Sequence, residues 1–143
     1  MLKKLFAPAN DSALTNFALL VLRVWLGGTL LLNHGLGKLT GFSSMSAGFP
    51  DPLGIGHSAS LALAIFAEVV AAVLIVAGLV TRLAALIAVV ELGVAFLCVH
   101  KMALSGDHSG ELAFIYMAGF VVLFLAGGGA ISLDKVLFKG SGK

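Results

Sequence analysis

The chain has 143 residues, of which 59% are hydrophobic and 11% are charged, with a formal net charge of +2 at pH 7. A mean hydropathy of +1.09 is more than a soluble domain of this length could bury, so we expect an integral membrane protein whose solvent is largely lipid. The small net charge gives no basis for nucleic-acid binding, and the single cysteine, Cys98, excludes an internal disulfide and dithiol chemistry.

The first apolar stretch, Leu19–Leu39, is long enough to cross a bilayer but also carries basic and titratable residues. At about 100° per residue, Arg23, His34 and Lys38 fall along one helical face. A charge in hydrocarbon costs about 2.5–3.5 kcal/mol on insertion scales, so such a face normally meets protein or a water-filled cavity. We therefore expect a spanning helix with one polar face.

Four apolar segments alternate with stretches rich in glycine, serine and proline, which predicts an all-α fold. The simplest arrangement is an integral membrane four-helix up-down bundle. We expect a membrane domain over residues 17–131, with an N-terminal segment over 1–16 and a C-terminal tail over 132–143, in which Ser132 caps a short helix. The expected spans are residues 17–39, 58–80, 83–101 and 110–131.

The distribution of Lys and Arg between the short flanks predicts the orientation. Six basic residues would lie on one side and two on the other, which predicts that both termini are cytoplasmic (N-in/C-in). The six are Lys3, Lys4, Arg82, Lys135, Lys139 and Lys143, and the two are Lys38 and Lys101.

Three charged residues are expected inside the membrane, namely Arg23, Glu68 and Glu91. One interpretation is a structural ion pair between Arg23 and Glu68, tuned by Glu91, that locks two helices together. The alternative is a proton-handling site, because one of the two carboxyl groups is left without a cation and such groups mark proton pathways in membranes.

A second polar cluster is expected at the outer face, where all four histidines of the chain fall. Imidazole titrates near neutral pH, and carboxyl and phenol groups donate protons, so this cluster is typical of a pocket that binds a polar head group. A haem held by His34 and His100 is disfavoured because no haem motif is present, and no metal site is expected. The candidate residues of the cluster are His34, Lys38, His100, Glu111 and Tyr116.

An ordered set of motif residues resembles the DoxX family of small membrane proteins, over residues 19–134. The resemblance implies a four-helix, multi-pass protein of the bacterial cytoplasmic (inner) membrane. The family takes its name from a subunit linked to thiosulfate:quinone oxidoreductase, and other members are associated with redox complexes. The set comprises Leu22-Arg23, Gly27, His34-Gly35, Lys38-Leu39, Gly41-Phe42, Glu68, Gly78-Leu79-Val80-Thr81-Arg82, His100, Glu111, Tyr116 and Ser132-Leu133-Asp134.

Three functions are compatible with these residues. The first is a membrane subunit of a quinone-linked oxidoreductase, which binds quinone or quinol in the outer polar pocket and receives electrons from a periplasmic or membrane redox partner. The second is a non-catalytic anchor or assembly factor for a partner protein. The third is a carrier of protons or small solutes, which would require a homo-oligomer because four helices enclose only a narrow pore.

Overall fold

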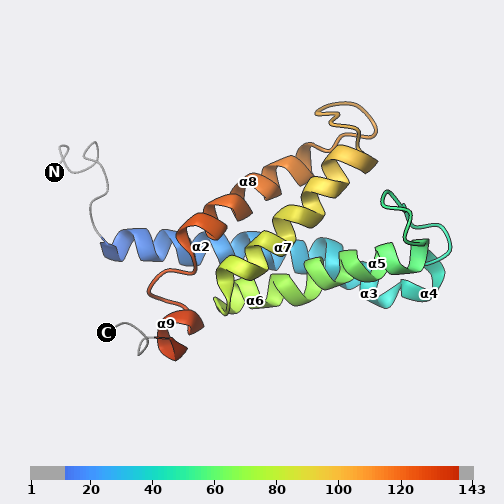
Figure 1. Ribbon diagram of the computed structural model, residues 1–143. Helices are drawn as coiled ribbons and strands as arrows, with labels where there is room; N and C mark the ends of the chain where they lie inside the picture. Colours follow the sequence, from blue (N-terminus) through green and yellow to red (C-terminus); the bar gives the residue numbers. More distant parts are fainter. Residues whose placement is uncertain (1–11, 139–143) are drawn as a thin grey trace.

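The computed structural model describes residues 12–138, and every regular element in that range is a helix (Figure 1). The first span is one continuous rod made of α2 (Ser12–Leu30), the π-helical segment η1 (Leu31–Gly35) and α3 (Leu36–Thr40). A single turn, α4 (Phe42–Met45), leads into a loop over residues 46–56. Within the described residues the helix already includes Ser12, five residues before the expected start of the span.

The next two spans form a helical hairpin. The second contains α5 (His57–Ile65), the π-helical segment η2 (Phe66–Ala71) and α6 (Ala72–Ala77). After a tight turn over residues 78–80, the third contains α7 (Thr81–Val94) and the π-helical segment η3 (Ala95–Val99). A loop over residues 100–110 precedes α8 (Glu111–Ala126), and the described chain ends with the short α9 (Leu133–Leu137).

Within the described residues, three helices are long and apolar enough to cross a membrane: Ser12–Thr40, His57–Ala77 and Thr81–Val99. The fourth expected span corresponds to α8, which has 16 residues and would rise about 24 Å at 1.5 Å per residue. The prediction of an all-helical membrane protein is confirmed, whereas the number of spans and the N-in/C-in topology stay predictions. The assigned terminal segments also stay predictions, and residues 1–11 and 139–143 lie outside the described range.

Small buried side chains bring the helices together. α7 packs along α8, and α6 packs along α2. Alanines at the contacts allow close approach, and larger side chains such as Leu30, Ile75 and Phe120 fill the centre of the core. Large apolar side chains face outward instead: Trp25 is 71% exposed and Leu125 is 67% exposed. An apolar outer surface around an apolar core fits an integral membrane protein.

The C-terminal segment closes the end of the bundle at the turn between α6 and α7. Gly78 adopts φ +70°, and a Cβ atom there would overlap the Arg23 guanidinium, so the turn needs glycine. The Asp134 carboxylate accepts hydrogen bonds from the backbone N–H of Val80 (2.6 Å) and from both the N–H (2.9 Å) and the hydroxyl (2.8 Å) of Thr81. These contacts satisfy donors at the first turn of α7. The predicted cap is confirmed, because Ser132 accepts a hydrogen bond from the backbone N–H of Lys135 at the start of α9.

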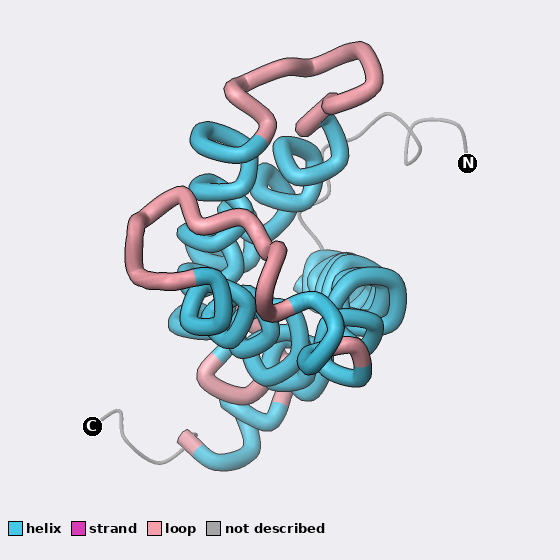
Figure 2. Tube along the Cα trace, turned by 90° about the vertical axis from the view of Figure 1, so that its right-hand side faces the viewer, coloured by secondary structure: helices cyan, strands magenta, loops and turns pink. Residues whose placement is uncertain are grey.

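Towards the opposite end, the helices diverge. The two arms of the hairpin move apart with distance from the turn over residues 78–80, so α5 and η3 are well separated (Figure 1). The loops over residues 46–56 and 100–110 both lie at this open end of the molecule (Figures 1 and 2). A cavity lies between the two arms of the hairpin at this end.

Candidate functional site

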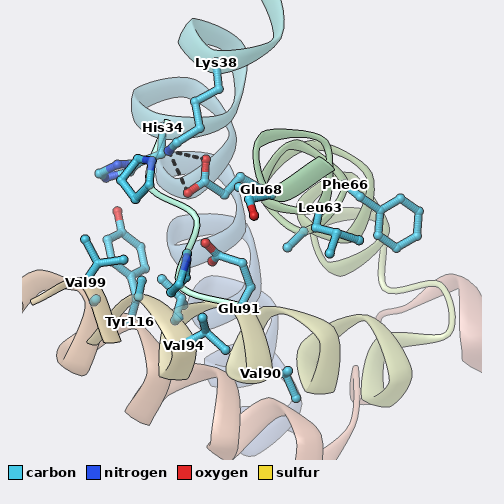
Figure 3. Close-up of a pocket in the computed structure, with 18 of the residues that line it drawn as sticks. His34, Lys38, Leu63, Phe66, Glu68, Val90, Glu91, Val94, Val99 and Tyr116 are labelled. Carbon is cyan, nitrogen blue, oxygen red and sulfur yellow. Dashed lines mark hydrogen bonds and ion pairs between the residues drawn. The ribbon is translucent and has the colours of Figure 1, made fainter. Parts of the chain in front are cut away.

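The cavity has a volume of about 750 Å³ and is bounded by all four long helices and the loop over residues 46–56. Most of its wall is apolar. Leu63 and Phe66 come from one arm of the hairpin, and Val90 and Val94 come from the other, with charged side chains between them (Figure 3). Leu63, Phe66 and Val90 are 54%, 47% and 58% exposed, so the cavity is open between the arms rather than enclosed.

An ion pair lies in the polar part of the cavity. Lys38 Nζ donates to both carboxylate oxygens of Glu68, at 2.8 and 2.6 Å, and the Glu68 side chain is only 6% exposed (Figure 3). Gly35 permits this pairing, because a Cβ atom there would overlap the backbone carbonyl of Glu68. The absence of a side chain lets η1 pack directly against η2, and Lys38, one turn after Gly35, then reaches Glu68.

Glu91, on α7, points into the same cavity from the facing helix, with its carboxyl group close to that of Glu68 (Figure 3). Its Oε2 atom is buried and has no hydrogen-bond partner among the described residues. A carboxylate oxygen accepts hydrogen bonds readily, and most buried polar atoms in proteins are satisfied. Glu91 is therefore the group in this cavity with the clearest unused hydrogen-bonding capacity.

An imidazole and a phenol complete the polar part of the cavity. The rings of His34 and Tyr116 meet edge to face, with centroids 5.9 Å apart and an interplanar angle of 85°. Tyr116 in turn stacks on the fully buried Phe120, at 6.2 Å and 17°, which holds the phenol in place. Both rings line the cavity on the side of Lys38 (Figure 3).

Each of the three long spans contains a π-helical segment beside the cavity. His34 lies in η1, Glu68 lies in η2, and His100 directly follows η3. A π-helical turn hydrogen-bonds from residue i to i+5, which is rare and occurs frequently at functional sites. The coincidence of three such segments with the polar side chains marks this cavity as the candidate functional site.

The loop over residues 46–56 closes one side of the cavity with apolar side chains, among them Phe49 and Leu53. Asp51 holds the loop to the start of α5: its carboxylate accepts from the hydroxyl of Ser60 (2.7 Å) and from the backbone N–H of Gly56 (2.8 Å) and Ile55 (3.0 Å). The hydrogen bond from Ser60, followed by those from the backbone, holds the pKa of Asp51 below its ordinary value.

More than half of the chain matches a known protein family. The DoxX family profile matches residues 18–101, which include every residue that contributes to the ion pair and the three π-helical segments. The chain belongs to the DoxX family. It is also 33% identical over 120 residues to an uncharacterized protein from Haemophilus influenzae, covering 77% of this chain and 84% of that protein. No solved structure matches the chain.

The structure of this DoxX-family protein brings together four of the five residues predicted for the outer cluster. His34, Lys38, His100 and Tyr116 all line the cavity. Glu111 does not line it, and its side chain is exposed at the start of α8. The separation has a simple cause, because five residues of α-helix rotate a side chain by about 140° relative to Tyr116.

The predicted ion pair between Arg23 and Glu68 is wrong. Arg23 instead donates to the backbone carbonyls of Val76 (3.2 Å) and Ile131, next to the turn over residues 78–80. Val76 lies eight residues after Glu68, which corresponds to about 12 Å along the helix. Antiparallel packing of α2 on α6 thus places Arg23 at the closed end of the bundle, and Glu68 forms its ion pair with Lys38 instead.

Glu68 and Glu91 therefore line the same cavity as the four residues of the predicted outer cluster named above, and they do not form a separate charge pair with Arg23. The available signal in the sequence was their position near the middle of two apolar spans, where carboxyl groups are costly and usually functional. The Asp51–Ser60 anchor carries no comparable signal, because aspartate and serine are common in any loop of this kind.

Proposed function

We propose that this protein binds the head group of an isoprenoid quinone or quinol and serves as a membrane subunit of a redox complex. The observation that carries the proposal is an open, mostly apolar cavity of about 750 Å³ with an ion pair, a carboxyl, an imidazole and a phenol at one side. A ligand that fits such a cavity has a polar head and an apolar tail, because sites of this size bind through their apolar walls and are oriented by a few polar groups.

The polar residues suit the two oxidation states of a quinone head group. Carbonyl oxygens accept hydrogen bonds, which the phenol of Tyr116 and the ammonium of Lys38 can donate; hydroxyl groups donate hydrogen bonds, which the carboxyl of Glu91 can accept. The imidazole of His34, beside Tyr116, adds two ring nitrogens that can donate or accept hydrogen bonds. The electrons would come from a periplasmic or membrane partner.

We further infer that the protein resides in the bacterial cytoplasmic membrane with both termini in the cytoplasm. The excess of Lys and Arg on one side, six against two, supports this orientation. Arg82 and Lys135 lie at the end closed by the C-terminal segment, whereas Lys101 lies in the loop at the cavity end. The cavity would then open in the outer half of the bilayer, where a periplasmic donor could reach its rim.

Binding tests the proposal directly. The purified protein in dodecyl maltoside is titrated with decylubiquinone by isothermal titration calorimetry, and its co-purified lipids are extracted and analysed by mass spectrometry. We expect saturable binding, native quinone in the extract, and weaker binding for Tyr116→Phe. A matched control is Phe114→Leu, because Phe114 lies on α8 but does not line the cavity.

Two results together would refute the quinone assignment: no quinone in the extract and no saturable binding of decylubiquinone. Quinol turnover in membrane vesicles with and without the protein then tests the redox role separately. Unchanged turnover in vesicles whose protein does bind quinone would contradict a role as an oxidoreductase subunit while leaving the binding site intact.

A further inference from the structure

The polar groups of the cavity differ in how far the protein itself satisfies them. Lys38 Nζ and both Glu68 oxygens are engaged with one another. Glu91 Oε2 is buried and has no partner among the described residues. Burying a carboxyl oxygen without a hydrogen bond is unfavourable, more so in a membrane than in a soluble protein. Glu91 nevertheless lines the cavity, so a polar atom of a ligand there would meet its carboxyl group.

The charges that surround Glu91 restrict the chemistry of that ligand. The ionisable groups that face the cavity from the neighbouring elements are Glu68 on η2, Lys38 on α3, His34 on η1 and Tyr116 on α8, with His100 at the end of η3. Lys38 is the one lysine or arginine that lines the cavity within the described chain, and Glu68 already neutralises it. An anionic head group would therefore meet two carboxyl groups and no lysine or arginine outside the ion pair. Like charges at close range repel one another strongly in a medium of low dielectric constant.

We propose that Glu91 contacts the polar end of the ligand and makes the cavity selective for neutral, hydrogen-bonding head groups over phosphate-bearing ones. The proposal rests on the proposed function, because it requires an amphipathic ligand in this cavity. It adds a basis for ligand specificity. Glu91 supplies a hydrogen bond to a quinone-like ring, and its carboxyl group weakens the binding of phospholipid head groups, which are far more abundant in the same membrane.

Two probes with the same tail and different heads test the selectivity. Decylubiquinone is neutral and decyl phosphate is anionic, and each carries one decyl chain. We expect the wild-type protein to bind decylubiquinone at least about tenfold more tightly than decyl phosphate, as measured by isothermal titration calorimetry in dodecyl maltoside.

Two substitutions separate the hydrogen bond from the charge. Glu91→Leu removes both and should weaken decylubiquinone binding about tenfold, the scale of one lost hydrogen bond to a buried group. Glu91→Gln retains hydrogen-bonding atoms and removes the acidic group, so decyl phosphate should bind about tenfold more tightly while decylubiquinone changes less than about threefold. Glu111→Gln is the matched control, because it removes an exposed carboxyl outside the cavity and should change neither affinity.

The outcomes distinguish this inference from the proposed function. Wild-type protein that binds decylubiquinone, with unchanged affinity in Glu91→Leu, would overturn the role of Glu91 and leave the quinone site standing. Wild-type protein that does not bind decylubiquinone would overturn both. If Glu91→Leu does not purify as a folded species, Glu91→Gln decides, and unchanged selectivity between the two probes overturns the inference.

Discussion

The ion pair between Lys38 and Glu68 offers the sharpest test of the helix register. Replacing Lys38 with methionine keeps most of the side-chain volume but leaves Glu68, only 6% exposed, as an uncompensated carboxylate. Breaking a buried pair in this way typically costs about 3–5 kcal/mol of folding free energy. Because the Lys38 side chain retains 19% exposure, water can partly reach the site, and we expect a loss near the lower end, about 3 kcal/mol.

The double substitution Lys38→Met/Glu68→Leu should restore most of this stability. Removing both members of a buried ion pair is often neutral, since two desolvation penalties disappear along with the attraction. We therefore expect the double variant to lie within about 1 kcal/mol of the wild-type protein, which corresponds to strong coupling between the two positions. Free energies of unfolding are measured by titration with sodium dodecyl sulfate in mixed micelles.

A second cycle, with Arg23→Met and Glu68→Leu, is the matched control. Arg23 bonds to the carbonyls of Val76 and Ile131 and makes no contact with Glu68, so the two effects should add within about 0.3–0.5 kcal/mol. Additive effects in the Lys38–Glu68 cycle, or strong coupling in the Arg23–Glu68 cycle, would refute the packing of η1 against η2 described above.

Three further predictions concern the elements that frame the cavity. Gly35→Ala should destabilise the protein by about 1–3 kcal/mol through overpacking against the Glu68 carbonyl, whereas Gly37→Ala, with open space around it, should be neutral or stabilising in the same titration. Asp134→Asn should cost about 1–2 kcal/mol, because it weakens the cap on α7, and an unchanged thermal midpoint would contradict that role. The pKa of Asp51 is lower in the folded protein than in the unfolded chain, so its stabilisation is present above about pH 4 and is lost as the pH falls through the folded value. Thermal midpoints between pH 7 and pH 3 should therefore fall less for Asp51→Asn than for wild type, and parallel curves would contradict the anchor.

The sequence was sufficient to predict the helices and the polar face of the first one. Hydrophobic runs of span length leave few alternatives. On the polar face, Arg23 is buried and His34 and Lys38 line the cavity, as the helical period requires. Ser132 was also predictable as a cap, since serine before an acidic residue is a common helix start. These features depend only on residues close together in the chain.

The partners of the charged residues were not predictable in the same way. Which residue of the first span faces Glu68 depends on the position of one helix along the other, and helix ends are uncertain by one or two residues each. The contact is fixed by Gly35, whose missing side chain lets η1 approach η2, and by the π-helical segments, which alter the phase of the side chains. Neither effect changes the hydrophobic pattern from which the spans were predicted.

Two buried polar atoms have no hydrogen-bond partner within the described residues, Arg23 Nε at the closed end of the bundle and Glu91 Oε2 at the cavity. The two side chains are not equivalent. Arg23 uses its other nitrogens on the backbone carbonyls of Val76, in the last turn of α6, and of Ile131. Its charge therefore serves the fold. Glu91 makes no comparable bond and lies in a cavity that is open between the two arms of the hairpin. Since unsatisfied polar groups are costly in lipid, the end where the Glu91 carboxyl lines a cavity is the end where a ligand gains most by binding.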